Sequence, residues 1–173
     1  YLYDHYTAGD GHNICASYAL NFAGGGLDCI HGMLTHDITA SGLADGGAHM
    51  RMICDASLPT FQLAFWARDR QRGPKLPVET VVAKLAGEPA ALYEMNDRGT
   101  LEVGKRADIN VIDMDRLTLG NFHVANDLPS GGARLLQDSS GYIATMVAGT
   151  LTRRHDRDTG ARPGRLLRST AFA

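Results

Sequence analysis

Cysteine is scarce in this 173-residue chain and widely spaced. Cys15, Cys29 and Cys54 form no Cys-x-x-Cys pair, and their number is odd. This usage argues against a disulfide scaffold and against a structural zinc knuckle. We therefore expect all three residues to be buried, reduced thiols.

Long apolar runs and a large excess of charge are also missing. No stretch approaches the roughly 20 apolar residues of a membrane span. The formal net charge is -2, so neither a membrane nor a nucleic acid is an expected partner. The run Gly24-Gly25-Gly26 lacks the glycine spacing and the lysine of a phosphate-binding loop, and it predicts a plain turn between a strand and a helix.

The chain opens on Tyr1-Leu2-Tyr3-Asp4 without an initiator methionine or a signal-like run. This start is typical of a segment of a longer polypeptide, and we expect a cytoplasmic protein. Hydrophobic residues make up 44% and charged residues 21% of the chain, which is ordinary for a globular protein.

Hydrophobic periodicity predicts alternating strands and helices in the first part of the chain. Alternation over Asn13 to Asn21 predicts a strand, helical spacing begins at Leu27, and Ile38 to Asp45 predicts a second strand. These three elements would form a β-α-β unit, whose two strands run parallel.

Two further helices and a strand-rich region are predicted downstream. Ser57 is a candidate N-cap for a helix that presents Leu58, Phe61, Phe65 and Trp66 on one face and ends at Gly73-Pro74. The second helix starts at Pro77 and stops at Gly87. Strands are predicted over Ala107 to Met114 and Tyr142 to Arg153, with a hairpin turn at Ala148-Gly149, and the basic tail from Asp156 is expected to be a loop.

The stretch Ser41 to Ser57 carries the candidate chemistry. Asp45 ends a predicted strand and His49 follows four positions later, and catalytic groups in βα-built enzymes project from the C-terminal ends of parallel strands. On the local pattern alone, Asp-Gly-Gly favours an ordinary turn. Asp55, like Ser57, is expected to cap the following helix.

Seven blocks in order carry a resemblance to a known superfamily. They are Asn21 to Asp28 (NFAGGGLD), Met33 to His36 (MLTH), Gly42 to His49 (GLADGGAH), Ile53 to Ser57 (ICDAS), Arg98 to Asp113 (RGTLEVGKRADINVID), Asp127 to Gly132 (DLPSGG) and Thr159 to Arg168 (TGARPGRLLR). On these blocks the chain resembles the C-terminal part of an amidohydrolase-superfamily enzyme, of the N-acyl-D-amino-acid deacylase (D-aminoacylase-like) group.

The resemblance implies an α/β fold. Residues 1–95 would be the last strand-helix units of a (β/α)8 TIM-type barrel, and residues 96–173 would add C-terminal strands to a small β-sandwich domain. A complete barrel needs roughly 250 residues, so the rest would come from the same enzyme or from a partner chain.

The resemblance also implies zinc-dependent hydrolysis of the amide bond of N-acyl-D-amino acids, with one or two divalent metals. Asp45 would be both a metal ligand and the catalytic proton carrier, although Ala44 stands where the family usually has serine. His49 would bind the substrate. Arg51, where relatives carry small residues, could bind a substrate carboxylate. The family's other metal ligands have no counterpart here, so the chain alone is expected to be inactive.

Two alternatives stay open. One is another amidohydrolase that acts on C–N bonds, of hydantoinase, deaminase or dipeptidase type, because Gly99 to Asp113 is shared across many of these enzymes. The other is a non-catalytic fragment or assembly module, whose exposed strand edges pair with a partner.

Overall fold

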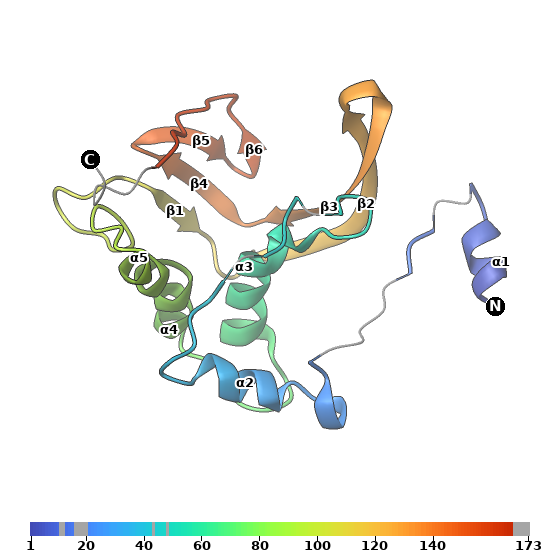
Figure 1. The fold of residues 1–173 in the computed structure, drawn as a ribbon, viewed down its shortest axis with the longest axis horizontal. Coiled ribbons are helices and arrows are strands. Elements are labelled where there is room, and N and C mark those ends of the chain that lie inside the picture. The colour runs from blue at the N-terminus through green and yellow to red at the C-terminus, as the bar shows by residue number, and fades with distance from the viewer. Residues whose placement is uncertain (11–12, 16–20, 43, 48, 168–173) are drawn as a thin grey trace. The chain divides into compact units, whose positions relative to one another are not determined.

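A computed structural model describes residues 1–10, 13–15, 21–42, 44–47 and 49–167 (Figure 1). The chain divides into two compact units. The first comprises Tyr1–Thr39 and Arg72–Pro74, and the second comprises Ala40–Gln71 and Lys75–Ala173. The domain boundary predicted at residues 95 and 96 falls inside the second unit and stays a prediction.

The first unit contains helix α1 (Leu2–Thr7), a 3-10 turn (Ala23–Gly25) and helix α2 (Asp28–Leu34). Helix α2 confirms the helix predicted from Leu27, with Asp28 in its first turn, where a negative charge is favoured. Neither helix contains a buried residue. Cys15 and Cys29 are free but exposed and Cys54 is half-buried, so the prediction of buried thiols was wrong.

The β-α-β unit predicted over Asn13 to Asp45 is not confirmed. Residues 16–20 of its first strand lie outside the described residues. The described residues of its second strand, Ile38 to Asp45, form no strand. A parallel strand is stable only with hydrogen-bonded neighbours and helical cover, and no described segment pairs with this one. The barrel portion of the predicted fold is therefore not confirmed.

The second unit begins with the helix predicted after Ser57. It consists of a 3-10 turn (Asp55–Ser57), α3 (Leu58–Phe61) and a π-helical segment (Gln62–Asp69). Its buried residues include Leu63, Ala64 and Trp66, whereas Leu58 is exposed. Leu63 and Ala64 lie outside the predicted face, and the wider π-helical turn, which rotates later residues around the helix, accounts for their burial. The predicted face was therefore only partly right.

The second predicted helix starts after Pro77 but continues past Gly87. It runs through α4 (Val78–Val82), a π-helical segment (Ala83–Gly87) and α5 (Glu88–Leu92). Pro89 has no N–H to donate, and the wider turn before it accommodates the missing hydrogen bond. Val81 is the buried anchor of this helix, with 2% of its surface exposed.

The strands form two antiparallel sheets. The four-stranded sheet has the order β1 (Ile109–Ile112), β4 (Tyr142–Val147), β5 (Thr150–Arg154) and β6 (Arg157–Asp158). It confirms both predicted strand regions and the hairpin turn at Ala148-Gly149. The two-stranded sheet, β2 (Thr118–Leu128) and β3 (Gly132–Ser140), was not predicted.

Arg68 joins the helix of residues 55–69 to the segment that precedes β2. Its guanidinium donates hydrogen bonds to the carbonyl of Met114 and, at 2.7 Å, to the carbonyl of Leu117. Leu117 is completely buried. A Cβ added to Gly141 would lie 2.6 Å from the Cα of Leu117, so only glycine permits this close approach.

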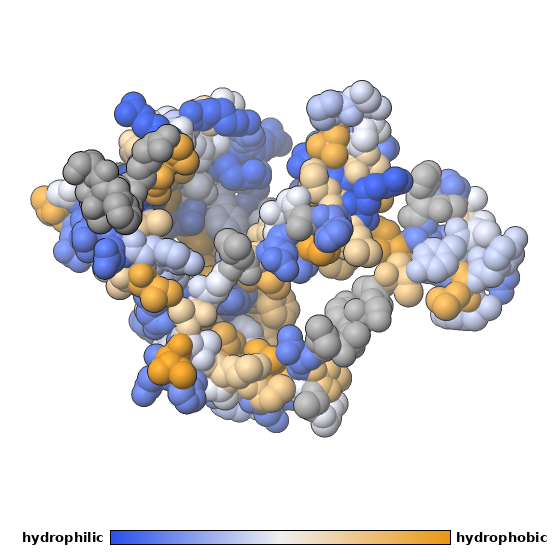
Figure 2. All heavy atoms as spheres, in the orientation of Figure 1, coloured by the Kyte–Doolittle hydropathy of each residue, from blue (hydrophilic) through white to orange (hydrophobic). Residues whose placement is uncertain are grey.

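Large apolar side chains are exposed in both units, and hydrophobic surface is visible in Figure 2. They include Tyr3 and Ile38 in the first unit and Leu101, Val103 and Leu166 in the second. Among the described helices, none has the length and apolar composition that crossing a bilayer requires.

The turn between β4 and β5 provides a test of the fold. Ala148 and Gly149 have φ values of 50° and 76°, as in a type I′ turn. Ala148→Asn should raise the free energy of unfolding by about 0.5–1 kcal/mol, because asparagine tolerates left-handed backbone better than alanine. Gly149→Ala should lower it by about 1 kcal/mol through backbone strain, since the added Cβ would meet no atom within 4 Å. Urea unfolding measures both changes, and a stabilising Gly149→Ala would contradict this turn geometry.

Candidate active-site loop

Asp45 lies in an exposed loop with an uncommon backbone conformation. Its φ is 47°, and that of His49 is 44°, so both occupy the left-handed region. Non-glycine residues in this region cost roughly 1 kcal/mol or more and concentrate at functional sites. The loop therefore holds its carboxylate in a conformation that the surrounding contacts must maintain.

One close packing contact and three backbone hydrogen bonds hold the loop. A Cβ added to Gly46 would lie 2.9 Å from the Cβ of Ala56, so the loop packs tightly against the start of the following helix. The carbonyl of His49 accepts hydrogen bonds from the N–H groups of Met52 (2.7 Å) and Ile53 (3.0 Å). The carbonyl of Met50 accepts one at 2.7 Å from the N–H of Leu135 in β3. These contacts join the loop both to the helix that follows it and to strand β3 of the β2–β3 hairpin.

The three predicted site residues lie close together in the sequence. Asp45, His49 and Arg51 are all exposed. Within the described part of the chain, no hydrogen bond or ion pair links their side chains to one another. Their assignment as catalytic and substrate-binding residues stays a prediction.

Asp55 and Ser57 do not cap the helix as predicted. The N-cap of the 3-10 turn is Cys54, and neither Cys54 nor Ser57 makes a capping hydrogen bond with its side chain. Ser57 has helical backbone angles (φ -78°, ψ -9°), whereas a side-chain N-cap needs an extended residue. Its hydroxyl donates instead to Oε1 of Gln137 in β3, at 2.6 Å.

Cys54, in the same loop, is not an activated nucleophile. Burial, reinforced by the neighbouring Asp55 carboxylate, raises the pKa of its thiol. The reactive thiolate is therefore disfavoured at neutral pH. Asp45 remains the candidate for proton transfer in this loop.

The described residues do not form a catalytic zinc site. Such a site usually takes three protein ligands and keeps one position open. Across the described ranges, no group of three His, Cys, Asp or Glu side chains is placed to hold a metal. Asp45 alone supplies a single carboxylate, which is too few ligands to support a reaction step through a metal.

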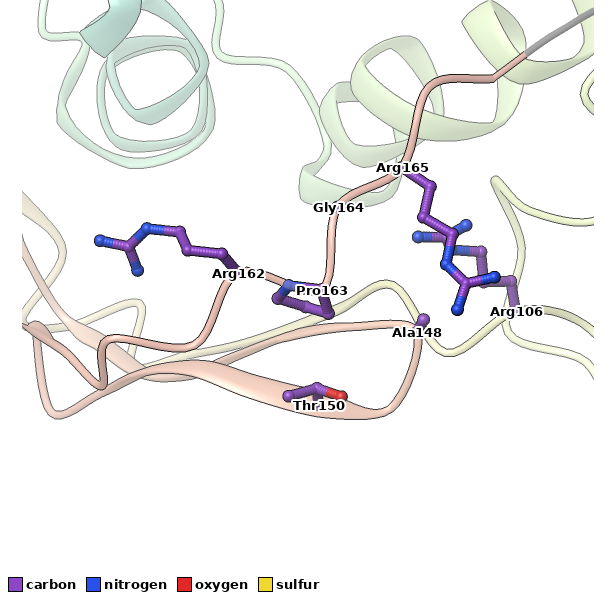
Figure 3. A pocket seen from close by; sticks show the side chains of 7 residues that line it. All are labelled: Arg106, Ala148, Thr150, Arg162, Pro163, Gly164 and Arg165. Carbon is purple, nitrogen blue, oxygen red and sulfur yellow. The ribbon is translucent and has the colours of Figure 1, made fainter.

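The second unit also contains a pocket of about 530 Å³ (Figure 3). Its lining includes Arg106, Arg162 and Arg165 together with Ala148 and Thr150 of the β4–β5 hairpin. The sequence patterns identified none of these arginines as site residues, although all three lie in the blocks that carry the family resemblance. The sequence shows the arginines themselves. It does not show that Arg106 and the β4–β5 hairpin lie beside the segment that carries Arg162 and Arg165.

Comparison with known proteins places the chain in a sequence family. The model of the amidohydrolase family matches residues 16–153. A protein named allantoinase from Solibacter usitatus (strain Ellin6076) is 31% identical over 107 residues, which cover 58% of this chain and 22% of that relative. No solved structure matches the chain.

The close contact between Gly46 and Ala56 tests how the loop is held. Gly46→Ala should lower the free energy of unfolding by about 1–3 kcal/mol, because the new methyl group overlaps Ala56. Adding Ala56→Gly removes the nearest atom and should recover part of this loss. Gly42→Ala is the matched control, since its added Cβ meets nothing within 4 Å. Equal effects of the Gly42 and Gly46 substitutions in urea unfolding would contradict the packing.

Proposed function

Because this chain belongs to the amidohydrolase family, we propose that it forms part of an enzyme that hydrolyses C–N bonds of the amide type. We propose N-acyl-D-amino acids as the substrates, as the blocks around Asp45 and Thr159 indicate. The observation that carries this proposal is the anchored loop that presents Asp45, an exposed carboxylate in left-handed backbone.

Asp45 is proposed to carry the proton. Hydrolysis of an amide requires a proton to leave the attacking water and another to reach the departing nitrogen. A carboxylate held beside both atoms can perform the two transfers in turn. The packing of Gly46 against Ala56 supports this role, because it restricts where the adjacent carboxylate can lie.

His49 and Arg51 are proposed to bind the substrate. An imidazole can donate a hydrogen bond to the acyl oxygen. A guanidinium can grip the free carboxylate of an N-acyl amino acid through two parallel hydrogen bonds. Both side chains are exposed on the same loop as Asp45, which is where a substrate would approach it.

Zinc and the rest of the barrel belong to the same proposal. The family commonly uses metals, and most ligands for one or two zinc ions would come from further polypeptide, either the same enzyme or a partner chain. The chain spans only 22% of the length of the allantoinase that it matches, which supports this view. A cytoplasmic location is supported by the three free thiols.

Three measurements on the natural protein test this part of the proposal. An intact mass equal to that of these 173 residues, with no copurifying partner, would refute the proposal that further polypeptide completes the enzyme. Metal analysis would refute zinc dependence if active protein contained none. Cell fractionation tests the location.

An allantoinase-type activity is the second candidate. It is favoured by the name of the matched relative, with 31% identity over 107 residues. Parallel assays with N-acetyl-D-amino acids and with allantoin separate the two activities. Failure of both, with a stable complex recovered, would favour the non-catalytic assembly module.

Replacement of Asp45 tests the proposed proton carrier. Asp45→Asn keeps the shape of the side chain, and asparagine tolerates positive φ, so the fold should be retained. We expect kcat to fall by roughly a hundredfold or more, because the amide cannot accept the proton. Asp55→Asn removes the same charge from the 3-10 turn that follows the loop and should leave kcat within about twofold. An unchanged rate in Asp45→Asn would eliminate this carboxylate as the catalytic base.

Replacement of Arg51 tests the substrate contact. Arg51→Gln should raise KM for an N-acetyl-D-amino acid by at least roughly tenfold, because glutamine cannot form the two charge-assisted hydrogen bonds with the carboxylate. The carboxamide analogue of the same substrate lacks the carboxylate, so its KM should not change. Equal effects on the two substrates would show that Arg51 does not bind the carboxylate.

A further inference from the structure

The arginine pocket lies between the β4–β5 hairpin and the segment that follows Thr159. Figure 3 shows Arg106 and Arg165 reaching the same end of the pocket, with Arg162 at the other end. Thr150 contributes a hydroxyl to the lining. No described residue of the Asp45 loop lines this pocket, so the pocket is distinct from the proposed active site.

Arg106 is only partly neutralised. Its Nε donates to Oδ1 of Asp108 at 2.8 Å. Asp108 also pairs with Arg98 at 3.3 Å and accepts the N–H of Ala148 at 2.7 Å. One carboxylate therefore serves two guanidiniums and a backbone amide. The terminal nitrogens of Arg106 have no hydrogen-bond partner among the described residues.

The other two arginines differ from each other. Arg162 forms a two-pronged pair with Asp158, at 2.9 and 2.7 Å. This pair lowers the pKa of Asp158 to about 2, so the carboxylate is ionised at neutral pH. Arg165, by contrast, meets no carboxylate within the portion of the chain that the structure describes. The end of the pocket that holds Arg106 and Arg165 therefore carries positive charge that Asp108 compensates only in part.

Two guanidiniums that share one end of a pocket repel each other, and a negatively charged oxygen group bound between them offsets this repulsion. Guanidinium groups match the planar geometry of carboxylates and the oxygens of phosphates. A volume of about 530 Å³ lies in the range of small-molecule sites. The net charge of -2 and the local character of the arginine cluster favour a small ligand over a nucleic acid.

We propose that Arg106 and Arg165 form a binding site for a small ligand that carries a carboxylate or phosphate group, with Thr150 as a further hydrogen-bond donor. Arg162, held by Asp158, forms the wall of the site rather than its centre. The segment from Ala161 to Arg165 thereby acquires a role beyond that of a solvated tail.

Titration calorimetry of the natural-length protein at low ionic strength tests this site. The probes are inorganic phosphate and succinate, with sodium chloride of equal ionic strength as the control. Saturable binding of either probe is expected, and preference for one of them identifies the ligand class. Heats that match those of sodium chloride would overturn the proposal.

Substitution of Arg165 locates the binding. Arg165→Gln should raise the Kd of the probe by roughly tenfold. The fold should be unaffected, because no described ion pair is lost. Arg154→Gln is the matched control, since Arg154 is exposed on β5 and does not line the pocket. An equal rise in Kd in the two variants would mean that the probe is attracted only by the overall charge of the protein, and it would overturn the proposal.

Discussion

The contact between Arg68 and the segment before β2 is the interaction on which the second unit depends. The guanidinium satisfies the carbonyls of Met114 and Leu117, and Leu117 is completely buried. Burial of these carbonyls without a donor would cost about 1–3 kcal/mol each. Gly141 allows the chain to pass within contact of Leu117. A second link, between the hydroxyls of Thr60 and Tyr142 at 2.7 Å, joins the same helix to β4.

The candidate loop depends on this assembly. Its far end leads into the helix that carries Arg68, and its middle is bonded to β3 through Met50 and Leu135. Ser57 adds a side-chain bond to Gln137 of the same strand. The left-handed conformation of Asp45 and His49 therefore rests on contacts with both helix and hairpin. In the proposed role of Asp45 as proton carrier, a carboxylate held in this way would need less reorganisation when a substrate binds.

Local sequence patterns predicted some elements well and missed others for physical reasons. The β4–β5 hairpin was predictable because β-branched residues flank a turn that contains glycine. Strands β2 and β3 were missed because β2 is mostly exposed and shows no alternation of buried and exposed residues. The strand predicted over Ile38 to Asp45 depends on parallel neighbours, which local hydrophobicity cannot supply. Gly87 does not end its helix, because the π-helical turn that includes Gly87 allows the helix to continue through Pro89.

The sequence by itself determined the starts of the two long helices, the turn at Ala148-Gly149 and the blocks by which the family is recognised. Each of these depends on residues that are near neighbours in the chain. Only the tertiary structure decided that Arg68 would cover the carbonyl of Leu117, and that Arg106 and Arg165 would share one pocket. Such contacts join segments that are far apart in sequence, and no linear pattern specifies which distant loops meet. The hydrogen bonds and the packing that make these contacts form only when the chain folds.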